Sequence, residues 1–218
     1  MIKEKLKRGY TTGVHTSFAF KSALQTFIAT KQLSISKTIK MDNDDLDVTK
    51  GCEIIVIITE NKDDLVLNKI EHKPYIFKNT NCNLELYAGV GVGIVTKDGL
   101  KPPKNHPAIN PKPLEVLREL FQNSKFKIQN SKLFCTAEVI NGHKISKQTA
   151  NKKVGILGGI SILGTTGFVK PISSTAYIDS INEELNFAKA NGYDTIIFTL
   201  GNTAYSKAIK HSKLNIQN

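Results

Sequence analysis

The stretch VGILGGISILGTTG, residues 154–167, decides the fold that the sequence predicts. Its first four residues form a short apolar run that indicates a buried strand, and a loop of glycines and hydroxyl side chains follows directly. A helix is expected over 174–190 and a second buried strand over 195–200. A strand, a crossover helix and another strand in this order are typical of a parallel sheet.

The earlier part of the chain has a different pattern. Apolar residues recur at helical spacing over 14–30, with Thr11 or Thr12 available to cap the start of that helix. Further strands are expected at 52–58, 64–70 and 132–140, and a second helix at 113–123. We therefore expect an α/β protein with an N-terminal α/β domain, 1–150, and the start of a parallel-sheet domain, 151–218.

Composition excludes several classes of protein. The 218 residues include 30 Lys and Arg against 19 Asp and Glu, which gives a formal net charge of +11. The longest apolar run, Ile54–Ile58, is far short of the roughly 20 residues that a membrane span needs. The basic N-terminus leads into no apolar signal region, and Cys52, Cys82 and Cys135 form no CxxC pair. We expect a cytoplasmic protein without a membrane segment, a disulfide framework or a zinc knuckle.

The excess positive charge predicts an anionic partner or simply a lysine-rich, solvated surface. Nucleic-acid-binding modules usually add arginine or exposed aromatic side chains for base contacts. This chain has only Arg8 and Arg118 as arginines and lacks the patterns of the common nucleic-acid-binding modules. The composition therefore favours a small molecule with several carboxylates or phosphates over nucleic acid, and leaves the solvated surface open.

The segment RGYTTG, Arg8–Gly13, stands at the start of the first predicted helix. Hydroxyl groups, a glycine turn and the free N–H groups of a helix start together form a natural anion site. Arg8 has the geometry to hold a carboxylate through two hydrogen bonds. The alternative is an ordinary helix cap beside a surface arginine.

The loop GGISILGTTG, Gly158–Gly167, follows the predicted strand at its carboxyl end, which is where ligands bind in open α/β sheets. Its glycines and hydroxyls could cradle the oxygens of a phosphate or carboxylate. Gly201 and Asn202 follow the next predicted strand and are expected at the same sheet edge.

Two other segments are candidates for a site. In Gly89–Lys97, GVGVGIVTK, alternate glycines let a ligand approach the backbone closely, although a bulged glycine-rich strand explains them equally. In Asp42–Asp47, DNDDLD, the carboxylates could hold a hard cation, but the spacing fails the EF-hand pattern. A solvated acidic turn is the preferred alternative, and a turn that orders the neighbouring loop is a third. No histidines stand at metal-ligand spacing, and no motif of covalent catalysis is present, so we expect neither a metal site nor an enzyme nucleophile.

Taken together, these segments resemble the CbiD family, the cobalt-precorrin-5B C1-methyltransferases of anaerobic cobalamin biosynthesis. The family's R-x-GYTTG segment matches Arg8–Gly13, and its DDPDVTHG-like stretch resembles Asp44–Gly51. Its G-x-GVGTVTKPGL…PAINPxP segment is very close to Gly89–Pro113, and its GISILGTTGIVxPxS segment is almost identical to Gly159–Ser173. A PGN-like motif lies at Leu200–Asn202. Family members run well past the length of this chain, so it resembles a C-terminally truncated member.

The resemblance implies a fold and a reaction. The first domain would be α+β, similar to the ribosomal S5 domain 2-like arrangement, and the second an incomplete Rossmann-like parallel sheet. The reaction would transfer a methyl group from S-adenosyl-L-methionine to C1 of cobalt-precorrin-5B, giving cobalt-precorrin-6A. Cobalt would enter only as part of the substrate, a polycarboxylate tetrapyrrole. Because the donor is already activated, the catalysis would come mainly from orienting two bound ligands. A homo-oligomer is left open.

The roles that follow from the resemblance are hypotheses. Substrate-binding residues would be Arg8, Tyr10, Thr11, Thr12, Gly13, Asp45, Asp47, Gly91, Gly93, Thr96, Lys97 and Asn110. Residues binding the methyl donor would be Gly158, Gly159, Ser161, Gly164, Thr165, Thr166, Gly167, Gly201 and Asn202. His15 is a candidate for catalytic proton transfer, the alternative being a histidine packed within the helix. Alternative functions are a truncated, non-catalytic remnant that binds an anionic tetrapyrrole or nucleotide-like ligand and, lower in rank, a basic nucleic-acid-binding protein.

Overall fold

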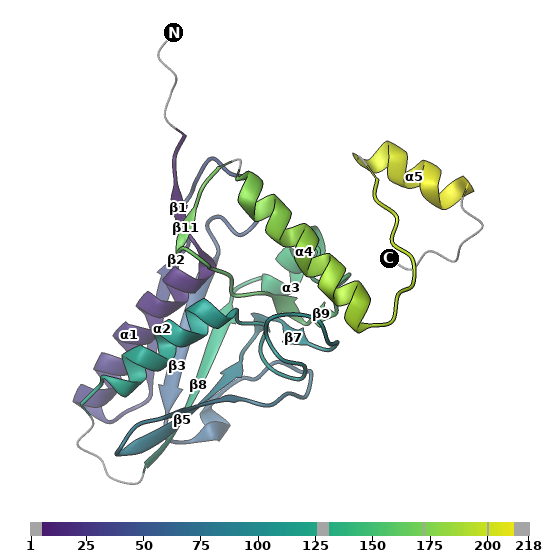
Figure 1. Ribbon diagram of the computed structural model, residues 1–218. Helices are drawn as coiled ribbons and strands as arrows, with labels where there is room; N and C mark the ends of the chain where they lie inside the picture. The colour runs from purple at the N-terminus through teal and green to yellow at the C-terminus, as the bar shows by residue number, and fades with distance from the viewer. Residues whose placement is uncertain (1–5, 126–130, 172, 200, 212–218) are drawn as a thin grey trace.

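A five-stranded mixed sheet forms the centre of the molecule, with strand order β2-β3-β8-β5-β4 (Figure 1). The structure, a computed structural model, describes residues 6–125, 131–171, 173–199 and 201–211. The strands of the sheet are β2 (Ser34–Ile39), β3 (Glu53–Thr59), β4 (Tyr75–Lys78), β5 (Cys82–Ala88) and β8 (Ser131–Val139). The β5–β8 pair is parallel and the other pairs are antiparallel, which makes the sheet mixed. The expectation of an α/β fold is confirmed.

Two helices, α1 (Thr12–Thr30) and α2 (Pro111–Gln122), pack side by side on the sheet (Figure 1). Successive strand residues point to opposite faces, so Ile54, Val56 and Ile58 of β3 share one face, and all are fully buried. They belong to the same apolar cluster as Phe20 of α1 and Phe121 of α2. Burial of these large side chains from both layers holds the helices against the sheet.

Three short strand pairs connect the region after residue 150 to the rest of the molecule. The strands are β1 (Gly9–Tyr10), β6 (Gly91–Val92), β7 (Ile94–Val95), β9 (Ile156–Leu157), β10 (Gly159–Ile160) and β11 (Phe168–Val169). β11 pairs with β1 and β9 with β7 in antiparallel fashion, whereas β10 pairs in parallel with β6. Residues 156–169 thus hydrogen-bond with segments from the first half of the chain, while the proposed boundary near 150 stays a prediction.

The remaining helices are α3 (Gly142–Ile145), α4 (Ser174–Ala190) and α5 (Gly201–His211), with short 3₁₀ turns η1 (Lys62–Asp64) and η2 (Ser146–Gln148). The helix predicted over 174–190 is confirmed. It lies against the loop after β7, since a Cβ on Gly99 would be 2.8 Å from the Cβ of Ala190. An ion pair of 2.9 Å between Lys101 and Glu183 holds the same contact. No helix among the described residues is long and apolar enough to cross a membrane.

Two strand predictions are wrong. The stretch 64–70 forms only an isolated bridge between Leu67 and Gly89. Residues 195–199 form no strand, and Leu200 lies outside the described residues. A strand needs a neighbour for its backbone hydrogen bonds, and the side chains of Ile197 and Phe198 are 42% and 70% exposed. The parallel strand–helix–strand unit expected after residue 150 is therefore not formed by the described part of the chain.

Candidate functional site

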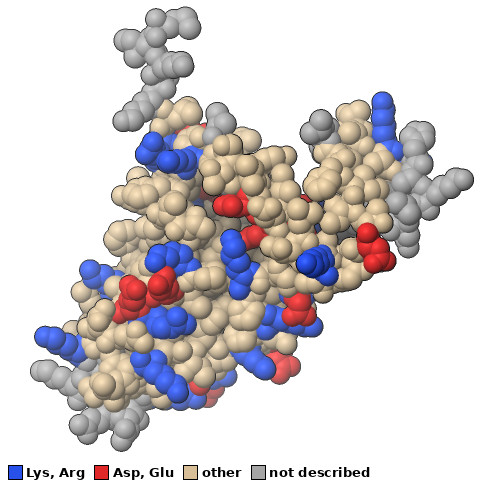
Figure 2. Space-filling view, viewed as in Figure 1, with Lys and Arg blue, Asp and Glu red and all other residues tan. Residues whose placement is uncertain are grey.

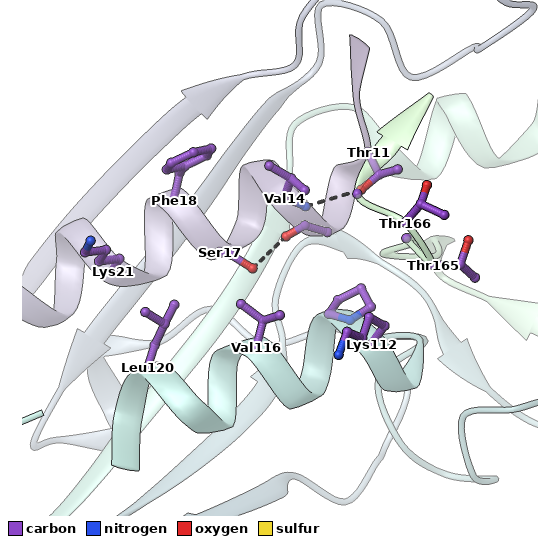
Figure 3. Close-up of a pocket in the computed structure, with 14 residues that line it drawn as sticks. Thr11, Val14, Ser17, Phe18, Lys21, Lys112, Val116, Leu120, Thr165 and Thr166 are labelled. Atoms are coloured by element: carbon purple, nitrogen blue, oxygen red, sulfur yellow. Dashed lines mark hydrogen bonds between the residues drawn. The ribbon is translucent and has the colours of Figure 1, made fainter. Parts of the chain in front are cut away.

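A pocket of about 390 Å³ lies between the N-terminal half of α1, the helix α2 and the loop 164–167 (Figure 3). It is lined by Thr11, Gly13, Val14, Ser17, Phe18, Lys21, Lys112, Pro113, Val116, Leu120, Gly164, Thr165, Thr166 and Gly167. Its walls are mainly apolar, and its hydroxyl groups come from two segments, the start of α1 and the loop 164–167. Among the described residues, its charged lining side chains are Lys21 and Lys112. This composition suits a ligand with an apolar framework and anionic or hydroxyl substituents.

Backbone hydrogen bonds join the loop to the start of α1. The Gly13 N–H donates to the Leu163 carbonyl at 2.8 Å, and the Thr11 N–H donates to the Gly167 carbonyl at 3.0 Å. The Leu163 N–H donates in turn to Oγ1 of Thr12 at 2.8 Å, across 151 residues of sequence. The segment Arg8–Gly13 and the loop Gly158–Gly167, which were predicted separately as anion sites, are therefore joined by hydrogen bonds.

Two N–H groups in the first turn of α1 already have partners within the chain. The Gly13 N–H donates to Leu163, and the Val14 N–H donates to Oγ1 of Thr11 at 3.4 Å. The Thr166 hydroxyl donates to the carbonyl of Phe168 at 3.3 Å. The Thr165 hydroxyl is exposed and has no hydrogen-bond partner in the described ranges, so it is free to contact a ligand.

Two glycines allow the pocket walls to approach each other. A Cβ on Gly13 would lie 2.5 Å from Cγ of Pro113, so α1 and α2 meet closely at this point. A Cβ on Gly164 would lie 2.7 Å from Oγ1 of Thr11, the oxygen that caps α1. A side chain at either position would displace a wall of the pocket.

Several other predicted ligand-binding glycines are tightly packed away from this pocket. A Cβ on Gly91 would lie 2.0 Å from the carbonyl oxygen of Val139, and a Cβ on Gly159 would lie 2.2 Å from the carbonyl oxygen of Gly91. A Cβ on Gly93 would lie 2.5 Å from Cγ2 of Ile156, and a Cβ on Gly158 would lie 2.6 Å from the side-chain amide nitrogen of Asn68. Close contact with neighbouring backbone accounts for glycine at Gly91 and Gly159, whereas the nearest atoms at Gly93 and Gly158 belong to the side chains of Ile156 and Asn68. Gly158 also has a positive φ of 82°, which favours glycine.

Ser161, Thr96 and Lys97, which were also predicted as site residues, lie outside the pocket. The Ser161 side chain is buried, and its hydroxyl donates to Oδ1 of Asn151 at 3.4 Å. The Thr96 hydroxyl donates to the Gly155 carbonyl at 2.7 Å, and Nζ of Lys97 lies 5.5 Å from the ring centroid of Phe187 in α4.

Further predicted residues occupy helix ends or the surface. Asn110 precedes α2 as its cap residue, and its N–H donates to the Ile162 carbonyl at 3.0 Å. Arg8 is exposed, and the ring of Tyr10 packs on Phe168 with centroids 5.3 Å apart. The backbone of Gly201 and Asn202 opens α5, and the side chain of Asn202 lies outside the described part of the structure.

The acidic segment is organised around a buried ion pair. Nζ of Lys40, with only 1% of its side chain exposed, contacts Oδ2 of Asp47, whose Oδ1 accepts from the Thr49 N–H at 2.9 Å. Burial would raise the pKa of Asp47, but hydrogen bonds from Lys40 and Thr49 outweigh it and hold the pKa below its ordinary value. In the described ranges no group of three or more His, Cys, Asp and Glu side chains could hold a metal ion.

This acidic turn holds the N-terminal strand in place. The Asp44 N–H donates to the Lys7 carbonyl at 3.0 Å, and the Lys7 N–H donates to Oδ2 of Asp44 at 2.5 Å. Asn43 is buried, and a Cβ on Gly9 would lie 3.0 Å from its Cβ. Asp45 is half-buried, with its N–H bonded to Oδ1 of Asn43. The geometry thus favours a turn that orders the neighbouring ligand loop.

His15 is buried on the side of α1 that faces the turn after β2. Its Nε2 accepts from the Met41 N–H at 3.2 Å, and it does not line the pocket. Burial and the nearby positive charge of Lys40 lower its pKa, so the neutral ring is favoured. This arrangement favours the alternative of a packed histidine over proton transfer to a ligand in the pocket.

His72 is a second histidine whose hydrogen bond requires the neutral ring. Nε2 of His72 accepts from the Ala88 N–H at 3.1 Å, and burial lowers the pKa of His72. For both histidines the folded-state pKa lies below the unfolded value of about 6.5. Near and below pH 6.5 the unfolded chain therefore binds more protons than the folded chain. The free energy of unfolding should therefore decrease as the pH is lowered from about 7.5 to about 5.

Urea denaturation followed by circular dichroism at a series of pH values would measure this dependence. In the double variant His15→Gln, His72→Gln, the amide oxygens can accept the same N–H groups without titrating, so the pH dependence in this range should become shallower. An equally steep dependence in the variant would show that other groups cause it.

Comparison with known proteins decides the family. The CbiD family model matches residues 29–171. The chain belongs to the CbiD family. The pocket of this CbiD-family chain combines residues inside the matched range, on α2 and the loop 164–167, with residues of α1 that precede it.

Two curated relatives of this CbiD chain carry the same name. The cobalt-precorrin-5B C(1)-methyltransferase of Methanococcus maripaludis is 37% identical over 182 residues, which are 83% of this chain and 46% of that protein. The protein of the same name from Methanocaldococcus jannaschii is 36% identical over 221 residues, 95% of this chain and 60% of that protein. A crystal structure of a cobalamin biosynthesis protein (cbiD) from Archaeoglobus fulgidus has 24% identity and a TM-score of 0.48, covering 94% of this chain and 67% of that one. The chain spans about half the length of the curated relatives it matches.

Proposed function

We propose that this chain takes part in the cobalt-precorrin-5B C1-methyltransferase reaction, in which C1 of the macrocycle receives a methyl group from S-adenosylmethionine and cobalt-precorrin-6A is formed. Membership of the CbiD family and the names of the relatives support this function. The observation that carries it is the pocket, because the segment at the start of α1 and the segment 159–167 are hydrogen-bonded together around it. The S5 domain 2-like and Rossmann-like descriptions of the two domains remain part of this proposal.

The residues of the pocket suit the task of orienting two reactants. S-adenosylmethionine supplies a methyl group bound to a positively charged sulfur. When C1 of the macrocycle accepts the methyl group, the sulfur leaves as a neutral thioether, so no nucleophile of the protein is needed. Val14, Pro113 and Val116 provide apolar walls that exclude water from bound ligands. The free hydroxyl of Thr165 can donate a hydrogen bond to a ribose hydroxyl or accept one from it. This fits an adenosyl ligand at this end of the pocket.

We assign the predicted residues to two kinds of role within this function. Thr11, Gly13 and the loop 164–167 contact the ligand. The other glycines and Ser161 act indirectly, because their close packing fixes the strands from which the loop begins. His15 and Asp47 likewise hold the segment that leads into α1.

The distribution of charge supports a small-molecule ligand. A protein that binds nucleic acid usually carries a continuous basic patch or stripe. On the face drawn in Figure 2, basic and acidic side chains are interspersed and no such stripe is present. The positive charge of this face is therefore better suited to local contacts with a polycarboxylate than to a nucleic-acid backbone.

Calorimetric titration with S-adenosylmethionine tests the assignment of the loop. In Gly164→Val the new side chain would overlap Oγ1 of Thr11, so affinity should fall by at least about tenfold, or ~1.4 kcal/mol. Thr165→Ala removes one hydrogen bond of about 0.5–1.5 kcal/mol and should weaken binding by roughly 2- to 10-fold. Thr30→Ala, at the far end of α1, is the matched control and should bind normally.

Thermal melts of each variant would confirm that the fold is retained. Unchanged affinity in both loop variants would remove the loop from the donor site. A methyl-transfer assay on cobalt-precorrin-5B with the purified chain then separates a catalyst from a protein that only binds its ligands.

A further inference from the structure

A second hollow extends the pocket along the helices. It has a volume of about 470 Å³ and shares Lys21, Val116 and Leu120 with the first. We call the two hollows together the α1–α2 groove. It runs from the loop 164–167 toward the C-terminal ends of both helices.

The surface of this groove is unusual for a helix face in water. The side chain of Phe18 lines it and is 58% exposed, and Val116 and Leu120 opposite are only half-buried. Large exposed apolar side chains that cluster beside a hollow mark a binding surface more often than an ordinary solvated surface. An aromatic ring among them offers a platform on which a flat ligand can stack.

The charges around the groove select the sign of its ligand. Lys21 is exposed and has no ion-pair partner within the described ranges, and Lys112 pairs only with Glu115, at 2.7 Å on the surface. Lys125 adds a further positive charge in the second hollow, where Glu119 is the acidic residue among the described lining residues. The groove therefore presents a net positive rim around apolar walls.

We propose that the α1–α2 groove binds a flat, polycarboxylate macrocycle, with Phe18 as the stacking platform and Lys21 and Lys112 as carboxylate contacts. The proposal rests on the proposed function and adds the residues that determine substrate specificity. The donor site at the loop 164–167 and the macrocycle site along the groove are then adjacent, as a direct methyl transfer between two bound ligands requires.

Titration of the chain with uroporphyrin I, which carries eight carboxylates, followed by its absorbance and fluorescence, tests the proposal. Coproporphyrin I, with four carboxylates, should bind more weakly. Lys21→Gln and Lys112→Gln should each weaken uroporphyrin binding by roughly 3- to 10-fold and reduce its dependence on salt. Phe18→Ser should weaken the binding of both porphyrins to a similar extent with little change in salt dependence. Lys21→Arg should retain most of the affinity.

Lys37→Gln is the matched control, because Lys37 is exposed on β2, outside the groove. The proposal fails if the wild-type chain does not bind uroporphyrin at about millimolar concentration, or if the control weakens binding as much as the two groove variants do. Calorimetry with S-adenosylmethionine separates this outcome from failure of the proposed function. Donor binding that persists in a chain without porphyrin binding overturns only the groove proposal. Porphyrin binding without any donor binding overturns the donor assignment and leaves the groove proposal intact.

Discussion

Gly91→Ala is expected to lower the free energy of unfolding by more than ~4 kcal/mol, enough to leave little folded protein. Gly91 has a φ of 80°, and a Cβ there would lie 2.0 Å from the carbonyl oxygen of Val139 and 3.0 Å from the backbone nitrogen of Gly142. All of these contacts are with backbone, so no side-chain rotation can relieve them. Urea denaturation followed by circular dichroism measures the effect.

The matched control for this variant is Gly51→Ala. Gly51 also has a positive φ, 69°, but a Cβ there meets nothing within 4 Å. The control should therefore show only the cost of a left-handed backbone, about 1–2 kcal/mol. If the two variants lose the same stability, close packing is not the reason for glycine at position 91, and its role as a ligand contact becomes the better explanation.

Asp47→Asn is expected to lower the free energy of unfolding by ~3 kcal/mol at neutral pH. The variant leaves the ammonium group of Lys40 almost fully buried without its counter-charge. Because the folded-state pKa of Asp47 is lowered, the wild-type stabilisation is present above the unfolded pKa and is lost as the pH falls through the folded pKa. The stability of the variant should lack this acid-dependent component.

Asp42→Asn provides the comparison, since the side chain of Asp42 is 71% exposed in its ion pairs with Lys7 and Lys50. Surface pairs of this kind contribute at most about 1 kcal/mol. The double variant Lys40→Met, Asp47→Leu should recover part of the stability that Asp47→Asn loses, because no charge remains buried. Equal losses for Asp42→Asn and Asp47→Asn would contradict the importance of the buried pair.

Helices were easier to predict from this sequence than strands. The helix of residues 174–190 has a clear start and a glycine shortly after its end, and the structure agrees with it. β2 was missed, because Ile35 and Ile39 are 61% and 60% exposed while the polar Ser34 is buried, which hides the apolar alternation of a strand. Residues 195–199 have strand-like composition, but the described chain offers them no strand to pair with.

The ligand loops were predictable only in part. The segment at the start of α1 and the loop 164–167 were both identified from their glycines and hydroxyls, and the structure brings them together. Phe18 and Lys21 were missed, although their spacing from Val14 places all three on one side of the helix. Val116 and Leu120 could not be found in this way, because the approach of α2 depends on the packing between Gly13 and Pro113.

The pairing of β1 with β11 also has a consequence for the order of folding. The contacts that close the pocket join residues 151 positions apart, so they can form only after the chain has been synthesised beyond residue 167. Contacts of such long sequence separation have a high cost in loop entropy and form slowly. During synthesis, the central sheet and its two helices can assemble first, and the pocket is completed in a later step. Recovery of ligand binding during refolding should therefore lag behind recovery of secondary structure.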